Sequence, residues 1–289
     1  MNVLFSIENL SCSYDKPYRE GFSRVVLEIR HLQLERGQKI FIVGESGIGK
    51  STILETLGMM SNTIVPDVNS RFYFYDTEGK TVDLCALWQK GDRELSSFRL
   101  SNYSFIFQST NLMRNFTAYE NVAYTRMLQG YSRKECFERT RQVLEKLGLN
   151  HIDDKRMTQE LSGGQQQRLA FARAILPEFA VLFGDEPTGN LDQENAVRVM
   201  KIIADKVDEL QNASAVIVSH DMHLATTFAD VIVKIRKEVR LKAHAEDENI
   251  VYGIIDDSCV FRPNALRSQW SGANESFETT DFEEFLRKK

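Results

Sequence analysis

The sequence predicts an α/β protein in which helices cover both faces of a mainly parallel sheet. Apolar segments at 39–44, 179–183 and 215–219 alternate with helix-like segments, as parallel strands joined by crossover helices do. Two further observations refine the fold: the N-terminal segments alternate apolar and polar residues, and a helical stretch at about 110–175 interrupts the strand–helix alternation. We therefore expect a core sheet, an N-terminal antiparallel β subdomain and an inserted α-helical lobe.

The first third of the chain contains the strands of this β subdomain and the first core strand. VLFSIENL and VVLEIRHLQLE follow a period of two, and the apolar run KIFIVG precedes a helix expected from Lys50 to about Met60. Two more strand-like runs, RFYFYD and YSFIF, are separated by a polar segment. Residues 61–98 are long and irregular.

Helices and strands alternate in the remainder of the core. A helical pattern extends from Ala118 to Leu147, and a second helix is expected to end near Ile175. The apolar run FAVLF, a helix from Asp192 to about Leu210, and the runs AVIVS and VIVKI then complete the expected sheet. These elements define a core domain at 1–235.

The segment 236–289 forms a C-terminal extension. KEVRLKAHAEDENI is highly charged, VYGIIDDSCVF is strand-like, SQWSGANESFETT is polar and turn-rich, and DFEEFLRKK has the pattern of a short amphipathic helix. Two interpretations stay open, a docking or regulatory element and extra strands with a helix that cover the core. We favour the second, because appended segments usually pack locally.

Composition limits the classes of partner and compartment. The 289 residues carry a formal charge of −5 without a basic run, so no nucleic-acid partner is expected. The scattered cysteines Cys12, Cys85, Cys136 and Cys259 indicate free thiols in a reducing compartment. The N-terminal residues lack a secretory pattern, and no apolar run approaches the roughly 20 residues of a membrane span. We expect a cytoplasmic protein, so a membrane role requires a separate subunit.

GESGIGKS, at 44–51, matches the phosphate-loop pattern between an expected strand and an expected helix, as a P-loop NTPase core requires. Its glycines permit a tight loop whose N–H groups face phosphate oxygens, Lys50 is expected to reach the β- and γ-phosphates, and Ser51 to ligate Mg²⁺. A glycine-rich turn with an incidental lysine is the disfavoured alternative. The predicted ATP-binding residues here are Gly44, Glu45, Ser46, Gly47, Ile48, Gly49, Lys50, Ser51 and Thr52.

Two acids end the apolar run FAVLFGDE. Open α/β sheets bind ligands at the carboxyl ends of their strands, so Asp185 is expected to hold Mg²⁺ and Glu186 to position or deprotonate the attacking water. Alone, this pair would better fit an ordinary polar strand end. Beside a phosphate loop, the catalytic interpretation is favoured.

Two glycines open an otherwise helix-favouring segment in ELSGGQQQR. Each glycine costs about 1 kcal/mol relative to alanine within a helix. Ser162 and Gln165 have the spacing of a capping box, so the helix is expected to begin there with the N–H groups of Gly163 and Gly164 open to an anion. This segment is a second candidate phosphate-binding device.

The order of phosphate loop, LSGGQ and acidic strand end resembles the nucleotide-binding subunit of ATP-binding-cassette (ABC) systems over roughly residues 3–235. The resemblance assigns Gln108 in FIFQ to the Q-loop, which senses Mg²⁺ and the attacking water, and Asp192 in GNLD to the D-loop. It makes His220 in VIVSHD the switch histidine that contacts the γ-phosphate. Tyr14 falls where the family places an aromatic against adenine, and Tyr18 and Phe22 are nearby alternatives.

The resemblance also implies an assembly. Two subunits pack head to tail, and each ATP lies between one chain's phosphate loop and the other chain's LSGGQ. The motifs are most similar to ATPases of the lipoprotein-releasing, macrolide-export and cell-division groups. We therefore expect an Mg²⁺-dependent ATPase that drives an integral membrane subunit from the inner face of the cell membrane, beside a second copy of itself or a homologous chain.

The sequence disfavours two other functions and one metal site. A soluble ABC protein acting on DNA or ribosomes is disfavoured, because the sequence shows neither heptads nor a second phosphate loop. A non-catalytic, ATP-gated binding module is disfavoured by the presence of Glu186 and His220. A zinc site at His220 and His223 is disfavoured, because zinc needs at least three protein ligands and no third is evident nearby.

Overall fold

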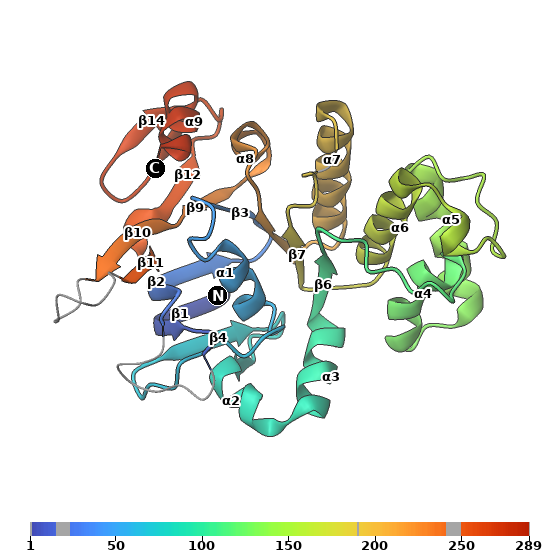
Figure 1. The fold of residues 1–289 in the computed structure, drawn as a ribbon, viewed down its shortest axis with the longest axis horizontal. Helices are drawn as coiled ribbons and strands as arrows, with labels where there is room; N and C mark the ends of the chain where they lie inside the picture. Colours follow the sequence, from blue (N-terminus) through green and yellow to red (C-terminus); the bar gives the residue numbers. More distant parts are fainter. Residues whose placement is uncertain (1, 16–23, 190, 241–249, 289) are drawn as a thin grey trace.

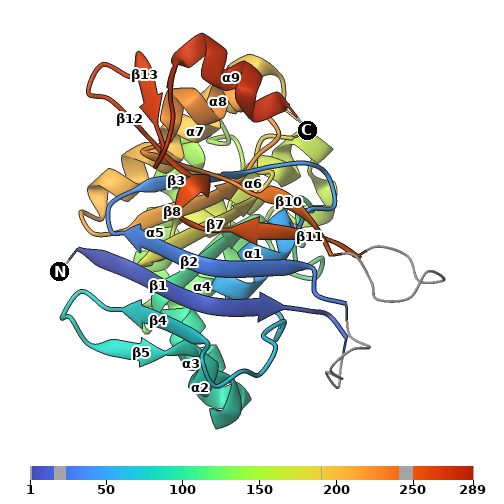
Figure 2. The same cartoon turned by 90° about the vertical axis from the view of Figure 1, so that its left-hand side faces the viewer.

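The computed structural model describes residues 2–15, 24–189, 191–240 and 250–288, and over these ranges the chain forms two sheets. One sheet has six strands and the other has eight, and α1 (Lys50–Leu57) follows the first core strand (Figures 1 and 2). The helical lobe lies to one side of both sheets in Figure 1. The predicted α/β class is thereby confirmed.

The six-stranded sheet has the order β10-β11-β2-β1-β4-β5, which can be followed in Figure 2. β1 pairs antiparallel with β2 and β4, and its alternate residues are buried, as the period of two predicted. β11, from the C-terminal extension, pairs in parallel with β2. The strands are β1 (Val3–Cys12), β2 (Leu27–Glu35), β4 (Arg71–Tyr75), β5 (Thr81–Asp83), β10 (Arg236–Arg240) and β11 (Ile250–Ile255).

The eight-stranded sheet has the order β14-β13-β12-β9-β3-β8-β7-β6. The five strands from β9 to β6 are parallel, and β12, β13 and β14 extend the sheet by successive antiparallel pairings. The strands are β3 (Lys39–Val43), β6 (Tyr103–Ile106), β7 (Val181–Asp185), β8 (Ser214–Val218), β9 (Val231–Lys234), β12 (Val260–Pro263), β13 (Gln269–Ser271) and β14 (Ser276–Glu278).

The helices cover the sheets and form the lobe. α4 (Ala118–Leu128), α5 (Arg133–Lys146) and the start of α6 (Gly163–Ile175) make the lobe in Figure 1. The others are α2 (Leu84–Lys90), α3 (Asp92–Asn102), α7 (Gln193–Glu209), α8 (Met222–Phe228) and α9 (Thr279–Arg287), with short 3-10 turns at Thr158–Glu160 and Asp257–Cys259. None of the helices in the described ranges is long and apolar enough to cross a membrane.

The two faces of the central strands bury different apolar clusters. In β3, Phe41 packs with residues of α6, α7 and α9, whereas Ile40 and Ile42 pack with residues of α1 and of the six-stranded sheet. All three side chains are almost fully buried. This two-sided burial explains why KIFIVG lacks an alternating pattern.

The structure corrects three sequence expectations. The polar segment before β6 is largely helical, forming α2 and α3, and Asp83 caps α2 by accepting a hydrogen bond from the Ala86 N–H at 3.0 Å. α1 ends at Leu57 rather than near Met60, because Met59 has a positive φ of 53°. VYGIIDDSCVF forms two strands, β11 and β12, which belong to different sheets.

The C-terminal segment contributes to both sheets and to the core. Phe261, Trp270 and Phe282 are essentially fully buried, and the rings of Trp270 and Phe282 stack with centroids 5.1 Å apart. α9 packs against α8, beside which it lies in Figure 1. Residues 250–288 therefore form extra strands and a helix over the core, as the favoured interpretation of the extension expected.

Candidate nucleotide-binding site

The phosphate loop connects β3 to α1 and holds the Lys50 side chain against its own backbone. The Lys50 ammonium donates hydrogen bonds to the carbonyl oxygens of Gly44 at 2.9 Å and Glu45 at 2.7 Å. Lys50 is only 6% exposed, and burial lowers its pKa, while the negative charges of Glu186, Asp185 and Glu45 act in the opposite direction. A cation is thus held at the loop beside the two acids that end β7.

The start of α1 is built to leave backbone donors free. Its N-cap is Gly49, whose φ of 107° is strained for any residue with a side chain, and no side chain caps the helix. A Cβ at Gly49 would also lie 3.3 Å from the Leu27 Cβ. The first N–H groups of α1 therefore point to a ligand position, and the positive end of the helix dipole favours an anion there.

Residues of the C-terminal extension pack against the phosphate loop. A Cβ at Gly253 of β11 would collide with the Ile48 carbonyl oxygen, and the Gly253 N–H donates to the Val26 carbonyl at 2.9 Å. The Lys237 ammonium lies 3.5 Å from the Glu45 carboxylate. Sequence reasoning missed this support, although a glycine within a strand is a recognised signal of close backbone approach.

The two acids after β7 differ in their environments. Burial raises the pKa of Asp185, helped by the negative charge of Glu186 and opposed by Lys50. Glu186 has a φ of 49°, which is uncommon for a residue with a side chain, and its N–H donates to the Val218 carbonyl at 3.0 Å. Its Oε1 lies 2.8 Å from His220 Nε2, so these two predicted catalytic residues are in direct contact.

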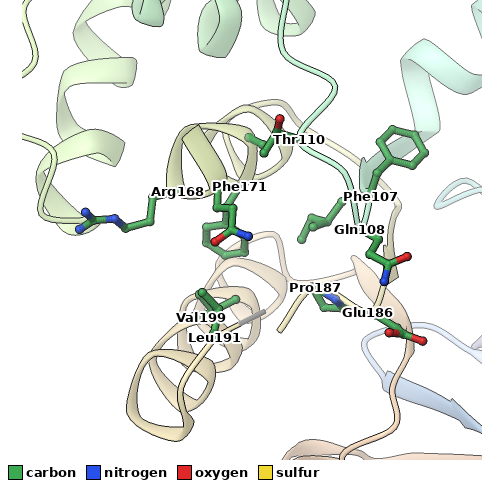
Figure 3. A pocket seen from close by; sticks show the side chains of 12 residues that line it. Phe107, Gln108, Thr110, Arg168, Phe171, Glu186, Pro187, Leu191 and Val199 are labelled. Atoms are coloured by element: carbon green, nitrogen blue, oxygen red, sulfur yellow. The ribbon is translucent and has the colours of Figure 1, made fainter. Parts of the chain in front are cut away.

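Gln108 and Glu186 line one pocket. Gln108 is the second residue after β6, and Figure 3 shows its side chain and that of Glu186 at the pocket, with Phe171 of α6 and Leu191 on other walls. The pocket therefore joins the ends of two parallel strands to the helix that begins at the glycine pair. An amide and a carboxylate converge where open sheets bind their ligands.

A second and larger cavity of about 560 Å³ is also lined by Glu186. Glu186, Ser219, His220 and Asp221 line it, together with Arg287 from the end of α9. Among the described residues that line this cavity, Arg287 supplies the only Lys or Arg cation. Arg287 was not among the predicted site residues, and the amphipathic pattern of DFEEFLRKK predicted the helix without indicating where it packs.

The glycine pair begins α6 as predicted from its spacing. Ser162 Oγ accepts from the Gln165 N–H at 3.4 Å, and Gln165 Oε1 accepts from the Ser162 N–H at 2.8 Å, which completes the capping box. Among the described residues, no atom outside the helix backbone lies within 4 Å of a Cβ built at Gly163 or Gly164, and neither has a positive φ. Nothing described in this chain therefore requires glycine at these positions.

The remaining predicted residues lie at the edges of the site. Tyr14 is 49% exposed, and its hydroxyl lies 3.1 Å from Glu55 Oε2 and 3.3 Å from Thr52 Oγ1 of α1. Tyr18 and Phe22 lie outside the described residues. Asp192 caps α7 by accepting from the Asn195 N–H at 2.9 Å, and hydrogen bonds from Asn195 lower its pKa. Ser46 and Ser51 are surface-accessible, whereas Thr52 is buried.

The structure separates the second histidine from the first. His223 Nδ1 lies 3.3 Å from Glu283 of α9, whereas His220 contacts Glu186. In the described part of the chain, no group of three or more His, Cys, Asp or Glu side chains has a metal-binding arrangement. The phosphate loop and the glycine pair are also apart, with β6 and β7 between α1 and α6 in Figure 1.

Comparisons with known proteins agree on one family. A family profile described as "ABC transporter" matches residues 27–189. The lipoprotein-releasing system ATP-binding protein LolD of Pseudoalteromonas translucida is 36% identical over 225 residues, covering 78% of this chain and 89% of that protein. The macrolide export ATP-binding/permease protein MacB of Aggregatibacter actinomycetemcomitans is 36% identical over 221 residues, covering 76% of this chain and 32% of that protein.

Solved structures give the same result. The dimeric structure of MJ0796, a bacterial ABC transporter cassette, aligns with a TM-score of 0.66 at 27% identity, covering 80% of this chain and 94% of that chain. A dimeric post-hydrolysis state of the same cassette, bound to ADP and Pi, aligns with a TM-score of 0.65.

Proposed function

The chain belongs to the ABC transporter family and is an ATP-binding ATPase subunit, and from that premise we propose that two copies hydrolyse ATP at shared sites to drive an integral membrane subunit. One observation carries the shared-site proposal: α6 begins with two bare glycines that no contact within the described chain explains. A helix start free of side chains suits close approach of an anion from outside the chain. The γ-phosphate held by a second copy's phosphate loop has that chemistry.

The residues around the acid pair fit a magnesium ion. Mg²⁺ prefers hard oxygen ligands, and the Ser51 hydroxyl, the Gln108 amide and the Asp185 carboxylate supply such oxygens around the phosphate loop. Burial raises the pKa of Asp185, a cost that a nearby divalent cation would offset by favouring the ionised carboxylate. When bound, the ion neutralises charge on the β- and γ-phosphates.

Each motif residue then has a role in hydrolysis. Water forms a bond to the γ-phosphorus as the bond to the β–γ bridging oxygen breaks, and Glu186 accepts or orients the water proton. Lys50 exchanges its contacts with the Gly44 and Glu45 carbonyls for phosphate oxygens. His220, held 2.8 Å from Glu186, contacts the γ-phosphate.

Glu186→Gln tests the catalytic role. The variant keeps the size of the side chain and removes the base, so we expect ATP binding to be retained and hydrolysis to slow by about 10²-fold or more. Turnover measured at saturating ATP gives the result. Turnover equal to that of the wild type would exclude Glu186 as the base.

The membrane partner is proposed to dock on the lobe that follows Gln108. The names of the relatives describe a lipoprotein-releasing system and an export permease, which supports a membrane-embedded partner at the cytoplasmic face. The sequence places Tyr119–Val122 in this lobe as candidate contact residues, but Tyr119, Asn121 and Val122 are buried. The exposed apolar residues of the same helix, Tyr124 and Leu128, replace them in the proposal.

Coexpression with the neighbouring genes tests this docking. A tagged chain is expected to capture a membrane protein after gentle detergent extraction, and Leu128→Asp is expected to weaken the capture by introducing a charge into an apolar contact. Glu138→Lys, on the exposed face of α5, serves as a charge-changing control. Capture of soluble proteins or nucleic acid alone would favour the soluble ABC alternative.

A further inference from the structure

The switch histidine lies between a fixed strand and a helix that cannot be stable alone. Ser219, which follows β8, is buried and its N–H donates to the Ile42 carbonyl at 3.3 Å. After His220, Asp221 caps α8 by accepting from the Leu224 N–H at 3.0 Å. α8 has only seven residues, and helices of this length depend on tertiary packing for their position.

In the described part of the chain, the His220 imidazole pairs with one side chain. The His220 side chain is 50% exposed, and its partner is the Glu186 carboxylate. The direction of this side chain therefore depends mainly on the backbone at 219–221, and so on where α8 begins. A shift of the reacting groups by about 1 Å can cost about 10²-fold in rate, which makes the placement of α8 important for turnover.

α9 of the C-terminal extension fixes α8 through one carboxylate. Glu283 Oε1 accepts from the Thr226 hydroxyl at 2.7 Å and lies 3.3 Å from His223 Nδ1, and both partners belong to α8. The Glu283 side chain is only 21% exposed, and its second oxygen lies 3.6 Å from Arg287. Partial burial strengthens such contacts relative to a surface ion pair.

α9 is itself anchored to the core. Its Phe282 and Leu286 are buried, and the ammonium of Lys234, the last residue of the core strand β9, donates to the carbonyls of Phe285 at 2.7 Å and Lys288 at 3.2 Å. These contacts hold the last turn of α9, from which Arg287 reaches the cavity beside Glu186 and His220. Contacts therefore connect β9 to α9, and Glu283 of α9 to α8, which begins just after His220.

We propose that Glu283 is a positioning residue for ATP hydrolysis, which acts by holding α8 so that His220 meets Glu186 and the γ-phosphate. The C-terminal helix is then part of the catalytic unit rather than only a cover for the core. The proposal rests on the role of His220 given under Proposed function. It gives the extension a specific effect on the chemical step, whereas ATP binding through the phosphate loop is left intact.

The main experiment compares Glu283→Ala with a matched neighbour in the full-length ATPase. Glu284 lies next to it on α9, is 70% exposed and pairs only with Lys288 among the contacts described. Glu283→Ala is expected to lower kcat by about tenfold, with KM for ATP changed by less than about twofold, because it moves groups that act after binding. Glu284→Ala is expected to match the wild type in both constants.

Glu283→Gln supplies a conservative rescue. Its amide oxygen can still accept from Thr226, so we expect most of kcat to return. A kcat for Glu283→Ala equal to that of the wild type, or equal losses in Glu283→Ala and Glu284→Ala, would overturn the proposal. If Glu283→Ala does not fold, Thr226→Val removes the same hydrogen bond with little change of shape. For this variant, a fall in kcat with KM unchanged would support the proposal, and an unchanged kcat would overturn it.

A double-mutant cycle separates this inference from the proposed function. If Glu283 acts through His220, adding Glu283→Ala to His220→Ala should lower the residual kcat no further, whereas independent roles multiply. Full activity of His220→Ala would refute the role of His220 itself. An inactive His220→Ala beside a fully active Glu283→Ala would refute the positioning role alone.

Discussion

The phosphate loop and the glycine pair of α6 both present the start of a helix to an anion, but only the first is completed by its own chain. Lys50 is buried and hydrogen-bonded to the loop backbone. Leu27 and Gly253 pack against the loop, and the two acids at the end of β7 lie nearby. By contrast, Ser162, Gly163 and Gly164 are all exposed, and their capping box satisfies the helix without any further partner.

Glycine is needed for different reasons in the two regions. At Gly49 and Gly253 the reason is internal, since a side chain would be strained or would collide with backbone. At Gly163 and Gly164 the described chain supplies no such reason, which agrees with the proposed contact to a second copy. Under the proposed shared site, the phosphate loop is a finished half-site and the glycine pair is a half-site that a second copy would complete.

The largest effect is expected from removing the cation of the finished half-site. Lys50→Ala deletes a buried ammonium that would contact two phosphates, so Kd for ATP should rise by about 100-fold or more. Titration with a fluorescent ATP analogue measures this. Lys90→Ala, at the exposed end of α2, is the matched control and should bind normally. Near-normal binding by Lys50→Ala would remove the loop from nucleotide recognition.

Mixed dimers test whether the two half-sites belong to different chains. Lys50→Ala inactivates the loop and Ser162→Arg blocks the glycine pair, so each homodimer should be inactive. A heterodimer of the two variants keeps one intact composite site and should regain part of the activity. Two affinity tags purified in series isolate this heterodimer before its ATPase activity is measured.

Wild type paired with the Lys50→Ala/Ser162→Arg chain is the control for this rescue. Each of its composite sites contains one damaged element, so it should be inactive in the head-to-tail arrangement. Activity in this pair, with none in the complementary pair, would place loop and glycine pair in one chain and contradict the shared site. Coupling between sites lowers the rescue but does not reverse the order of the two pairs.

Two glycine substitutions should separate stability from activity. Gly253→Ala forces a Cβ against the Ile48 carbonyl and should destabilise the fold by about 1–3 kcal/mol while weakening ATP binding. Gly164→Ala meets nothing within 4 Å and should leave stability unchanged or raise it by up to about 1 kcal/mol. Its ATPase activity should nevertheless fall. Urea denaturation and turnover, measured on the same samples, distinguish the two; a destabilised Gly164→Ala would argue for an internal role.

The smallest effect concerns Asp185 and pH. Burial raises the pKa of this carboxyl in the folded state, so its contribution to stability is fully present below the ordinary pKa and is lost as pH rises through the raised value. Asp185→Asn removes the cost of burying the ionised carboxylate. Its Tm should therefore exceed that of the wild type at pH 7 and differ less from it at pH 4, while hydrolysis falls. Asp154→Asn, on the lobe surface, is the control. An equal change in Tm at both pH values would contradict this origin.

Features that depend on residues close together in the sequence could be predicted from it, whereas features that depend on contacts between distant residues could not. The capping box at Ser162 and the loop at Gly44 follow from residues three to seven positions apart, so local spacing was sufficient. α2 and α3 were missed because each buries only one or two side chains and shows a weak apolar period. Glu283 was missed because its partners, His223 and Thr226, lie about sixty residues away and meet it only when α9 packs on α8.

Pairing between β11 and β2 sets an order of events during synthesis. Gly253 pairs with Leu27, more than 200 residues earlier in the chain, and it closes the space beneath the phosphate loop. A ribosome adds roughly 5–20 residues per second, so the loop is synthesised roughly 10–40 s before its support. A nascent chain therefore carries a complete Gly44–Ser51 motif without a complete nucleotide site. Before that point ATP can bind only at a loop that lacks the Gly253 contact, so we expect ATP to stabilise the fold fully only late in translation.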